Sequence, residues 1–192
     1  GRDGSALTNN DADGKAGFSF TKISSSGNVL SSTALLGTGP NDWACTHDNV
    51  TGLMWEVKTT SGLRSMNHTY SWYSSDSATN GGNVGTASGG ICALSGRCDT
   101  EKYVQDVNAV GLCGRNDWRL PSIGELEGIA NFGGAAPLID QTYFPNTPAA
   151  SFWSSSPYAI GFGAWSVLFD TGFVDVDSRS NPGRVFVVRE GR

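Results

Sequence analysis

Cys45, His47 and Asp48 lie close together in the sequence and could form a cysteine nucleophile activated by a histidine. The chain has four cysteines, which are Cys45, Cys92, Cys98 and Cys113. An even count in a chain rich in Gly and Ser and poor in Lys predicts two disulfides and an oxidising compartment. Three pairings are possible. We favour Cys92–Cys98, which closes a short loop, and Cys45–Cys113, which ties the early part of the chain to the middle. A disulfide at Cys45 would remove the nucleophile.

The alternatives to disulfides are a zinc site and free cytosolic thiols. The cysteine spacings contain no C-x-x-C pair, which makes zinc the poorer interpretation. Free thiols remain the second alternative.

Other residues that could carry chemistry have simpler explanations. Asp175, Asp177 and Asn181 could offer oxygen ligands to calcium, but a D-x-D pattern on a strand is usually solvated. Glu125 is better explained as a helix cap than as a catalytic acid. Trp153 precedes a run of serines that lacks a G-x-S-x-G elbow. The sequence therefore predicts no catalytic residue, no metal and no cofactor.

The bulk composition excludes several classes of partner. The 192 residues carry a formal net charge of −5, and Lys and Arg do not cluster, so nucleic acid is an unsuitable ligand. The same acidity disfavours a sulfated glycan. No segment has the apolar length that would span a bilayer, so we expect no direct membrane insertion. The 26 glycines and the 16% charged residues favour turns and short strands.

Two helices are expected to position the rest of the chain. The first covers residues 99–109, with Asp99 as its cap and with Tyr103, Val107 and Val110 on one face. The second follows Ser122 as the N-cap, with Glu125 completing a capping box, and should end near residues 131–134.

Short strands are expected around these helices, at residues 18–23, 43–45 and 53–57 and in an antiparallel meander from residue 152 onward. Residues 59–90 are poor in aliphatic side chains and indicate a long surface insertion. Residues 1–15 are interpreted as an arm or a tag remnant. Together these features predict an α+β fold, loop-rich, with two helices packed on short antiparallel strands.

Several segments carry a resemblance to a known family. They are residues 50–56 (VTGLMWE), 113–121 (CGRNDWRLP), 139–145 (IDQTYFP), 153–156 (WSSS), 165–167 (WSV) and 188–189 (VR). In this order they resemble the Lcl C-terminal domain family. The resemblance implies a C-type-lectin-like fold, related to formylglycine-generating enzymes and to phage receptor-binding proteins. It also implies a secreted or cell-surface binding module.

The resemblance divides the chain into two parts. Residues 1–42 form an N-terminal arm and first strand, either separate from the domain or integral to it. Residues 43–192 form the C-type-lectin-like domain, with a variable-type ligand-binding region at 158–189. Some similar domains are variable proteins of diversity-generating retroelements, whose randomised codons do not yield Lys, Glu, Gln, Met or Trp. Residues 160–189 contain no Lys, Glu, Gln or Met, and their single Trp is Trp165, a scaffold position in the family pattern.

Alternation along a strand predicts which residues of this region face a partner. Trp165, Val167 and Phe169 should point into the core, and their alternating neighbours should face solvent. Exposed Phe and Leu side chains edged by charge would make a protein-contact surface. The predicted ligand-binding residues are Ile160, Phe162, Ser166, Leu168, Asp170, Phe173, Asp175, Asp177, Arg179, Asn181, Arg184 and Phe186. The alternative is that the Phe and Leu residues belong to the core.

The leading functional hypothesis is a retroelement variable protein that binds a protein ligand or a cell-surface receptor. The second is a glycan-binding bacterial adhesin, with Trp72, Tyr73 and Asp177 as its contacts. The third is an oxidase like the formylglycine-generating enzymes, which would need free cysteines.

Overall fold

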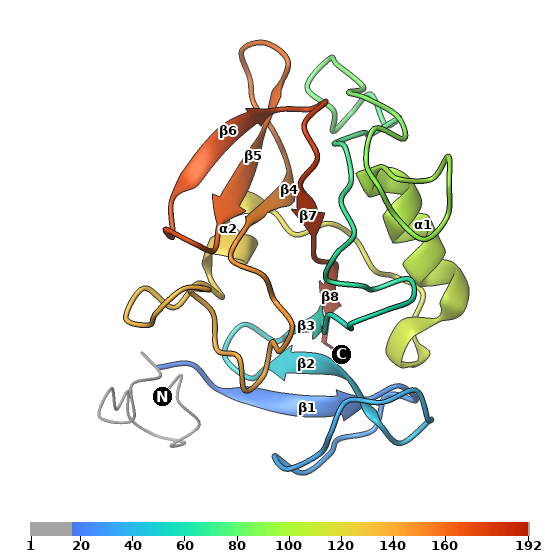
Figure 1. The fold of residues 1–192 in the computed structure, drawn as a ribbon, viewed down its shortest axis with the longest axis vertical. Helices are drawn as coiled ribbons and strands as arrows, with labels where there is room; N and C mark the ends of the chain where they lie inside the picture. The colour runs from blue at the N-terminus through green and yellow to red at the C-terminus, as the bar shows by residue number, and fades with distance from the viewer. Residues whose placement is uncertain (1–16, 192) are drawn as a thin grey trace.

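Two four-stranded sheets and two α-helices make up the α+β fold of residues 17–191, which the computed structural model describes (Figure 1). The strands are β1 (Phe20–Ser24), β2 (Trp43–Asp48), β3 (Leu53–Glu56), β4 (Ser151–Pro157), β5 (Gly163–Leu168), β6 (Val174–Ser178), β7 (Arg184–Val185) and β8 (Val188–Glu190). The helices are α1 (Thr100–Val110) and α2 (Ile123–Glu127), and a 3-10 turn, η2 (Leu112–Gly114), follows α1. None of the helices in this part of the chain is long and apolar enough to cross a membrane.

The first sheet has the strand order β1-β2-β3-β8, and all its pairs are antiparallel. Strand β1 pairs with β2 from Phe20 opposite Asp48 to Ser24 opposite Trp43. The first strand is therefore part of the same sheet as the strands that follow residue 43. The arm predicted for residues 1–15 lies outside the described residues.

The second sheet has the order β6-β5-β4-β7. Strands β4, β5 and β6 form the expected antiparallel meander. The meander does not continue to the end of the chain, because β7 pairs parallel to β4, with Phe152 opposite Arg184. The next strand, β8, then pairs with β3 in the first sheet. The C-terminal segment thus runs from one sheet into the other (Figure 1).

Helix α1 begins and ends where the sequence predicts. The Asp99 side chain accepts a hydrogen bond from Lys102 N, and Gly111 ends the helix in the left-handed region with φ 65°. Tyr103 and Val107 are buried. The prediction that Val110 shares their environment is wrong, since this side chain is 66% exposed at the last turn.

Helix α2 is shorter than predicted. Ser122 and Glu125 form the expected capping box, and Leu126 and Ile129 are buried. The helix ends at Glu127 rather than near residues 131–134, because Gly124 lies inside this five-residue helix and Gly128 follows it, and glycine weakens a helix. The Glu125 carboxylate also accepts hydrogen bonds from both Nη atoms of Arg119, at 2.8 and 2.7 Å.

Both favoured disulfides are present. Cys45–Cys113 has its Cα atoms 6.5 Å apart and joins β2 to the turn after α1, and Cys92–Cys98 has them 5.4 Å apart. No cysteine in the described part of the chain is free.

The second sheet separates two apolar cores. Trp153 and Ala164 face the core that contains Tyr70 and Trp72, whereas Phe152 and Val167 face the core that contains Leu126. The sheet is therefore covered on both faces where β4 and β5 run side by side.

Candidate functional site

The expected alternation along β5 holds only in part. Val167 and Phe169 are fully buried and Asp170 is exposed, as predicted. Ser166 is fully buried and Trp165 is half-exposed, which is the reverse of the prediction.

The cause is the core that contains Tyr70 and Trp72. Ser166 lies opposite Trp153 on the face of the sheet that the segment 59–90 covers. That cover is fixed by Trp72, whose Nε1 donates to Ser154 O at 2.9 Å. Alternation assigns residues to two faces, but it does not show that a distant insertion buries one of them.

Arg179 is a scaffold residue rather than a contact residue. It is only 2% exposed, and its guanidinium lies 4.1 Å from the centroid of the Trp72 ring. Its Nε donates to Gly163 O at 2.8 Å, and its Nη1 donates to Asn80 O at 2.9 Å and also to Asn83 O. Burial lowers the pKa of Arg179 from its usual value. The side chain therefore joins the insertion to the start of β5, directly after the β4–β5 loop.

Phe186 and Arg184 also do not belong to the predicted contact surface. Phe186 is fully buried and stacks on Phe152 with ring centroids 4.7 Å apart. Arg184 is half-buried on β7, at the edge of the sheet opposite β6, and its Nη1 donates to His68 O at 2.8 Å. Burial lowers the pKa of Arg184 as well.

The eight other predicted residues are at least partly exposed, but they do not form one patch. They are Ile160, Phe162, Leu168, Asp170, Phe173, Asp175, Asp177 and Asn181. Phe162 directly precedes β5, whereas Phe173 lies beyond its other end, where its carbonyl accepts from Leu168 N. Strand β5 has six residues and spans about 20 Å. The two Phe side chains therefore lie at opposite ends of the sheet.

The first group is the tip surface, which we define as Tyr158, Ile160, Phe162, Trp165 and Val176. Ile160 and Phe162 are 78% and 79% exposed on the loop between β4 and β5. Below them, the half-exposed rings of Tyr158 and Trp165 meet edge to face at 5.5 Å, and Val176 pairs with Trp165 across the strands. The tip surface is thus an exposed apolar group on the β4–β5 hairpin. The loop of this hairpin lies at one end of the molecule (Figure 1).

The second group is the turn patch, which we define as Phe132, Leu138 and Phe173. Phe173 is 70% exposed after the β5–β6 turn, and Phe132 is 60% exposed. Gly172, which directly precedes Phe173, lies against Phe132 and Leu138, since a Cβ there would stand 2.7 Å from the Phe132 ring and 3.0 Å from Leu138. We did not predict Phe132 as a site residue. A large aromatic residue followed by two glycines, at the predicted end of the second helix, was the available signal.

The acidic residues of β6 protect the edge of the sheet. Asp175 Oδ1 accepts from Val176 N at 2.7 Å, and Asp177 Oδ1 accepts from Ser178 N at 2.8 Å. Arg179 N donates to Phe162 O, so the amides of residues 176 and 178 point away from β5 in the alternating antiparallel pattern. The two carboxylates therefore accept hydrogen bonds from the amides with which an added strand would pair.

A family model described as the Lcl C-terminal domain matches residues 44–189. The chain belongs to the Lcl C-terminal domain family. A search of curated proteins gave no significant match.

The match places both exposed groups inside the Lcl C-terminal domain, because it runs from β2 to β8. It also includes the buried residues Ser166, Arg179 and Phe186. In residues 160–189 of this Lcl C-terminal domain, buried residues therefore occur among exposed ones at positions where strand alternation predicts exposure.

The residues proposed for a glycan site in this Lcl C-terminal domain do not form one. Trp72 is 1% exposed and covered by Arg179, so its ring offers no face to a sugar. Asp177 Oδ1 accepts from Asn181 Nδ2 at 2.6 Å in addition to Ser178 N. Within the described residues, no three His, Cys, Asp or Glu side chains are grouped so that they could hold a metal ion.

Proposed function

We propose that this Lcl C-terminal domain is a secreted or surface-displayed module with a C-type-lectin-like fold that binds a protein ligand through the tip surface. The observation that supports this most directly is the exposure of Ile160 and Phe162, at 78% and 79%, on one short loop. Large apolar side chains gathered at one exposed place mark an interaction site more often than isolated ones do.

The chemistry around the tip surface suits a protein. Its centre is aromatic and aliphatic, and the exposed Ser178, which pairs with Gly163 beside the loop, lies on the same face of the sheet as Trp165 and Val176. An apolar centre with a polar rim is the usual composition of protein interfaces. A sugar would need an exposed aromatic face with several fixed hydrogen-bonding groups, and Trp72 does not provide one.

The loop can vary while the sheet stays intact. Tyr158 N donates to Gly163 O at 3.1 Å and closes the hairpin below residues 159–162. Substitutions at Ile160 and Phe162 then change the contact surface without loss of core packing. This separation supports the proposal that the exposed positions within 160–189 are diversified, and a nearby reverse transcriptase gene with a near-copy of these codons would test it.

The two disulfides support an extracellular location, because such bonds persist in oxidising compartments. They also favour a binding module over an oxidase that depends on free thiols. A thiol titration of the native protein should find no reactive cysteine. A titration that finds one would reopen the oxidase interpretation.

A screen against an array of extracellular proteins and a glycan array tests the function directly. We expect a protein hit whose binding is lost in the Ile160→Ser/Phe162→Ser variant. Leu35→Ser is the matched control, since Leu35 is 81% exposed in the β1–β2 connection. All variants should unfold at the wild-type temperature. Equal binding by the tip variant, or hits on glycans alone, would contradict the proposal.

A further inference from the structure

A pocket of about 550 Å³ lies beside the Cys45–Cys113 disulfide, at the C-terminal end of α1. The β4–β5 loop lies at the top of the molecule in Figure 1, whereas the C-terminal end of α1 lies in its lower half. The pocket is lined by Ser25, Gly37, Thr38, Thr59, Ser61, Leu63, Arg64, Val110, Gly111, Leu112 and Cys113. No residue of this lining is acidic, although the whole chain carries a net charge of −5.

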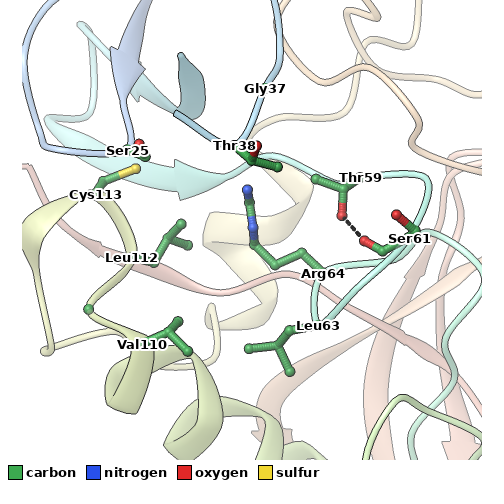
Figure 2. A pocket seen from close by; sticks show the side chains of 11 residues that line it. Ser25, Gly37, Thr38, Thr59, Ser61, Leu63, Arg64, Val110, Leu112 and Cys113 are labelled. Carbon is green, nitrogen blue, oxygen red and sulfur yellow. Dashed lines mark hydrogen bonds between the residues drawn. The ribbon is translucent and has the colours of Figure 1, made fainter. Parts of the chain in front are cut away.

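Arg64 is held at the centre of this pocket. Its Nη1 donates to Ala44 O at 2.9 Å and to Val57 O at 2.6 Å, which fixes the guanidinium against the first sheet. Figure 2 shows the side chain extending between Leu112 and the Thr59–Ser61 turn toward Thr38. Within the described residues, Nε and Nη2 of Arg64 have no hydrogen-bond acceptor. A guanidinium fixed at one nitrogen therefore keeps donors for an anion.

The walls around Arg64 divide into a polar and an apolar side. Thr38 and Ser61 are exposed, and their hydroxyls make no hydrogen bond within the described part of the chain. Thr59 Oγ1 donates to Ser61 O at 2.8 Å and closes the turn that carries Ser61 (Figure 2). The opposite wall is formed by Leu63, Val110 and Leu112 (Figure 2). Such a pocket offers donors and acceptors to hydroxyl groups and a C–H surface to a carbon skeleton.

The local charge is positive. Arg64 and Arg184 both act electrostatically on the buried Lys58, which pairs with Glu56 at 2.7 Å. The buried carboxylate of Glu56 is therefore paired with Lys58, and Arg64 is the charged side chain that lines the pocket. An anion that enters the pocket is attracted by the positive charge of Arg64, because charges of opposite sign attract.

We propose that this pocket binds a small organic carboxylate that carries hydroxyl groups, of the size of one acidic sugar unit. The carboxylate pairs with the free edge of Arg64, the hydroxyls contact Thr38 and Ser61, and the carbon skeleton lies on Leu63 and Val110. This site is separate from the tip surface and does not depend on the protein ligand proposed above.

The test is a titration of the whole chain with sodium glucuronate, monitored by NMR amide shifts and by calorimetry. We expect shifts at the residues that line the pocket. Glucose, which lacks the carboxylate, should bind at least about tenfold more weakly, because one charge-assisted contact is lost. N-acetylglycine carries a carboxylate without the hydroxyls and should also bind more weakly. Equal binding of glucose would overturn the role of Arg64, and equal binding of N-acetylglycine would overturn the hydroxyl contacts.

Two variants locate the site without removing the structural bonds of Arg64. Val110→Trp should fill the pocket and abolish glucuronate binding, because Val110 is an exposed wall residue. Val84→Trp is the matched control, since Val84 is 46% exposed and does not line the pocket. Both should keep the wild-type thermal stability and the same protein-ligand binding. Unchanged glucuronate binding in Val110→Trp, or shifts confined to other surfaces, would overturn the proposal.

Discussion

The guanidinium of Arg179 lies over the ring of Trp72, 4.1 Å from its centroid, and joins the long insertion to the sheet that carries the tip surface. No acidic side chain within the described residues pairs with it. Backbone carbonyls of Gly163, Asn80 and Asn83 accept its hydrogen bonds instead. A cation buried among carbonyls and an aromatic face is costly to lose, because all these groups are then left without their partner.

Replacement of Arg179 by Met should therefore lower the free energy of unfolding by about 2–4 kcal/mol. Urea denaturation measures the change. Arg115→Met is the control, because Arg115 is exposed, and it should differ little from wild type. A loss no larger than that of the control would show that Arg179 does not fasten the insertion.

Removal of the two edge carboxylates should make the protein self-associate. In the Asp175→Ser/Asp177→Ser variant the amides of Val176 and Ser178 lose their side-chain acceptors, so the edge of β6 can pair with another strand. Analytical ultracentrifugation should detect dimers or larger species. Asp170→Ser removes a carboxylate beyond the end of β5 and should leave the protein in its wild-type state of association.

The two disulfides should differ in their contribution to stability. Cys45–Cys113 closes a loop with a sequence separation of 68 residues, and Cys92–Cys98 closes one of 6. The loop-entropy relation gives about 4 kcal/mol for the first and about 2 kcal/mol for the second. Paired Cys→Ala variants, compared by denaturant unfolding, test this order. The opposite order would mean that the short loop also carries contacts that the fold needs.

Acid should destabilise the protein through Glu125 and Asp117. Hydrogen bonds from Arg119 lower the pKa of Glu125, and hydrogen bonds from Arg189 lower the pKa of Asp117. Each carboxylate has a lower pKa in the folded protein than in the unfolded chain. Its contribution to the free energy of unfolding is therefore fully present above the unfolded-state pKa of about 4, and it is lost as the pH falls through the folded-state pKa. Denaturation midpoints between about pH 5 and pH 2 measure this loss. The Glu125→Gln/Asp117→Asn variant should show a flatter profile, and an unchanged profile would assign the acid sensitivity to other groups.

Local signals in the sequence predicted much of the fold. Asp99 and Ser122 cap the two helices because capping needs only residues within one turn. The disulfide pairing followed from loop lengths and from the positions of the cysteines. The order of the C-terminal strands did not follow, because the parallel pairing of β7 with β4 depends on contacts that no local pattern encodes.

The candidate site was predicted less completely. Ile160, Phe162 and Phe173 are exposed as expected, but Ser166, Arg179 and Phe186 are buried by segments far away in the sequence. The buried Glu56, which accepts from Lys58, Tyr103 and Val187 N, was also missed. A polar residue inside a short apolar strand does not reveal which distant groups will satisfy it.

The position of β7 and β8 has a consequence for biosynthesis. Each sheet takes one of its four strands from residues 184–190, so neither is complete while the earlier part of the domain leaves the ribosome. Both sheets of the nascent polypeptide therefore remain incomplete until residues 184–190 have been made. If the protein is exported, as proposed above, it would cross a translocation channel before both sheets close, and its four cysteines would be oxidised afterwards.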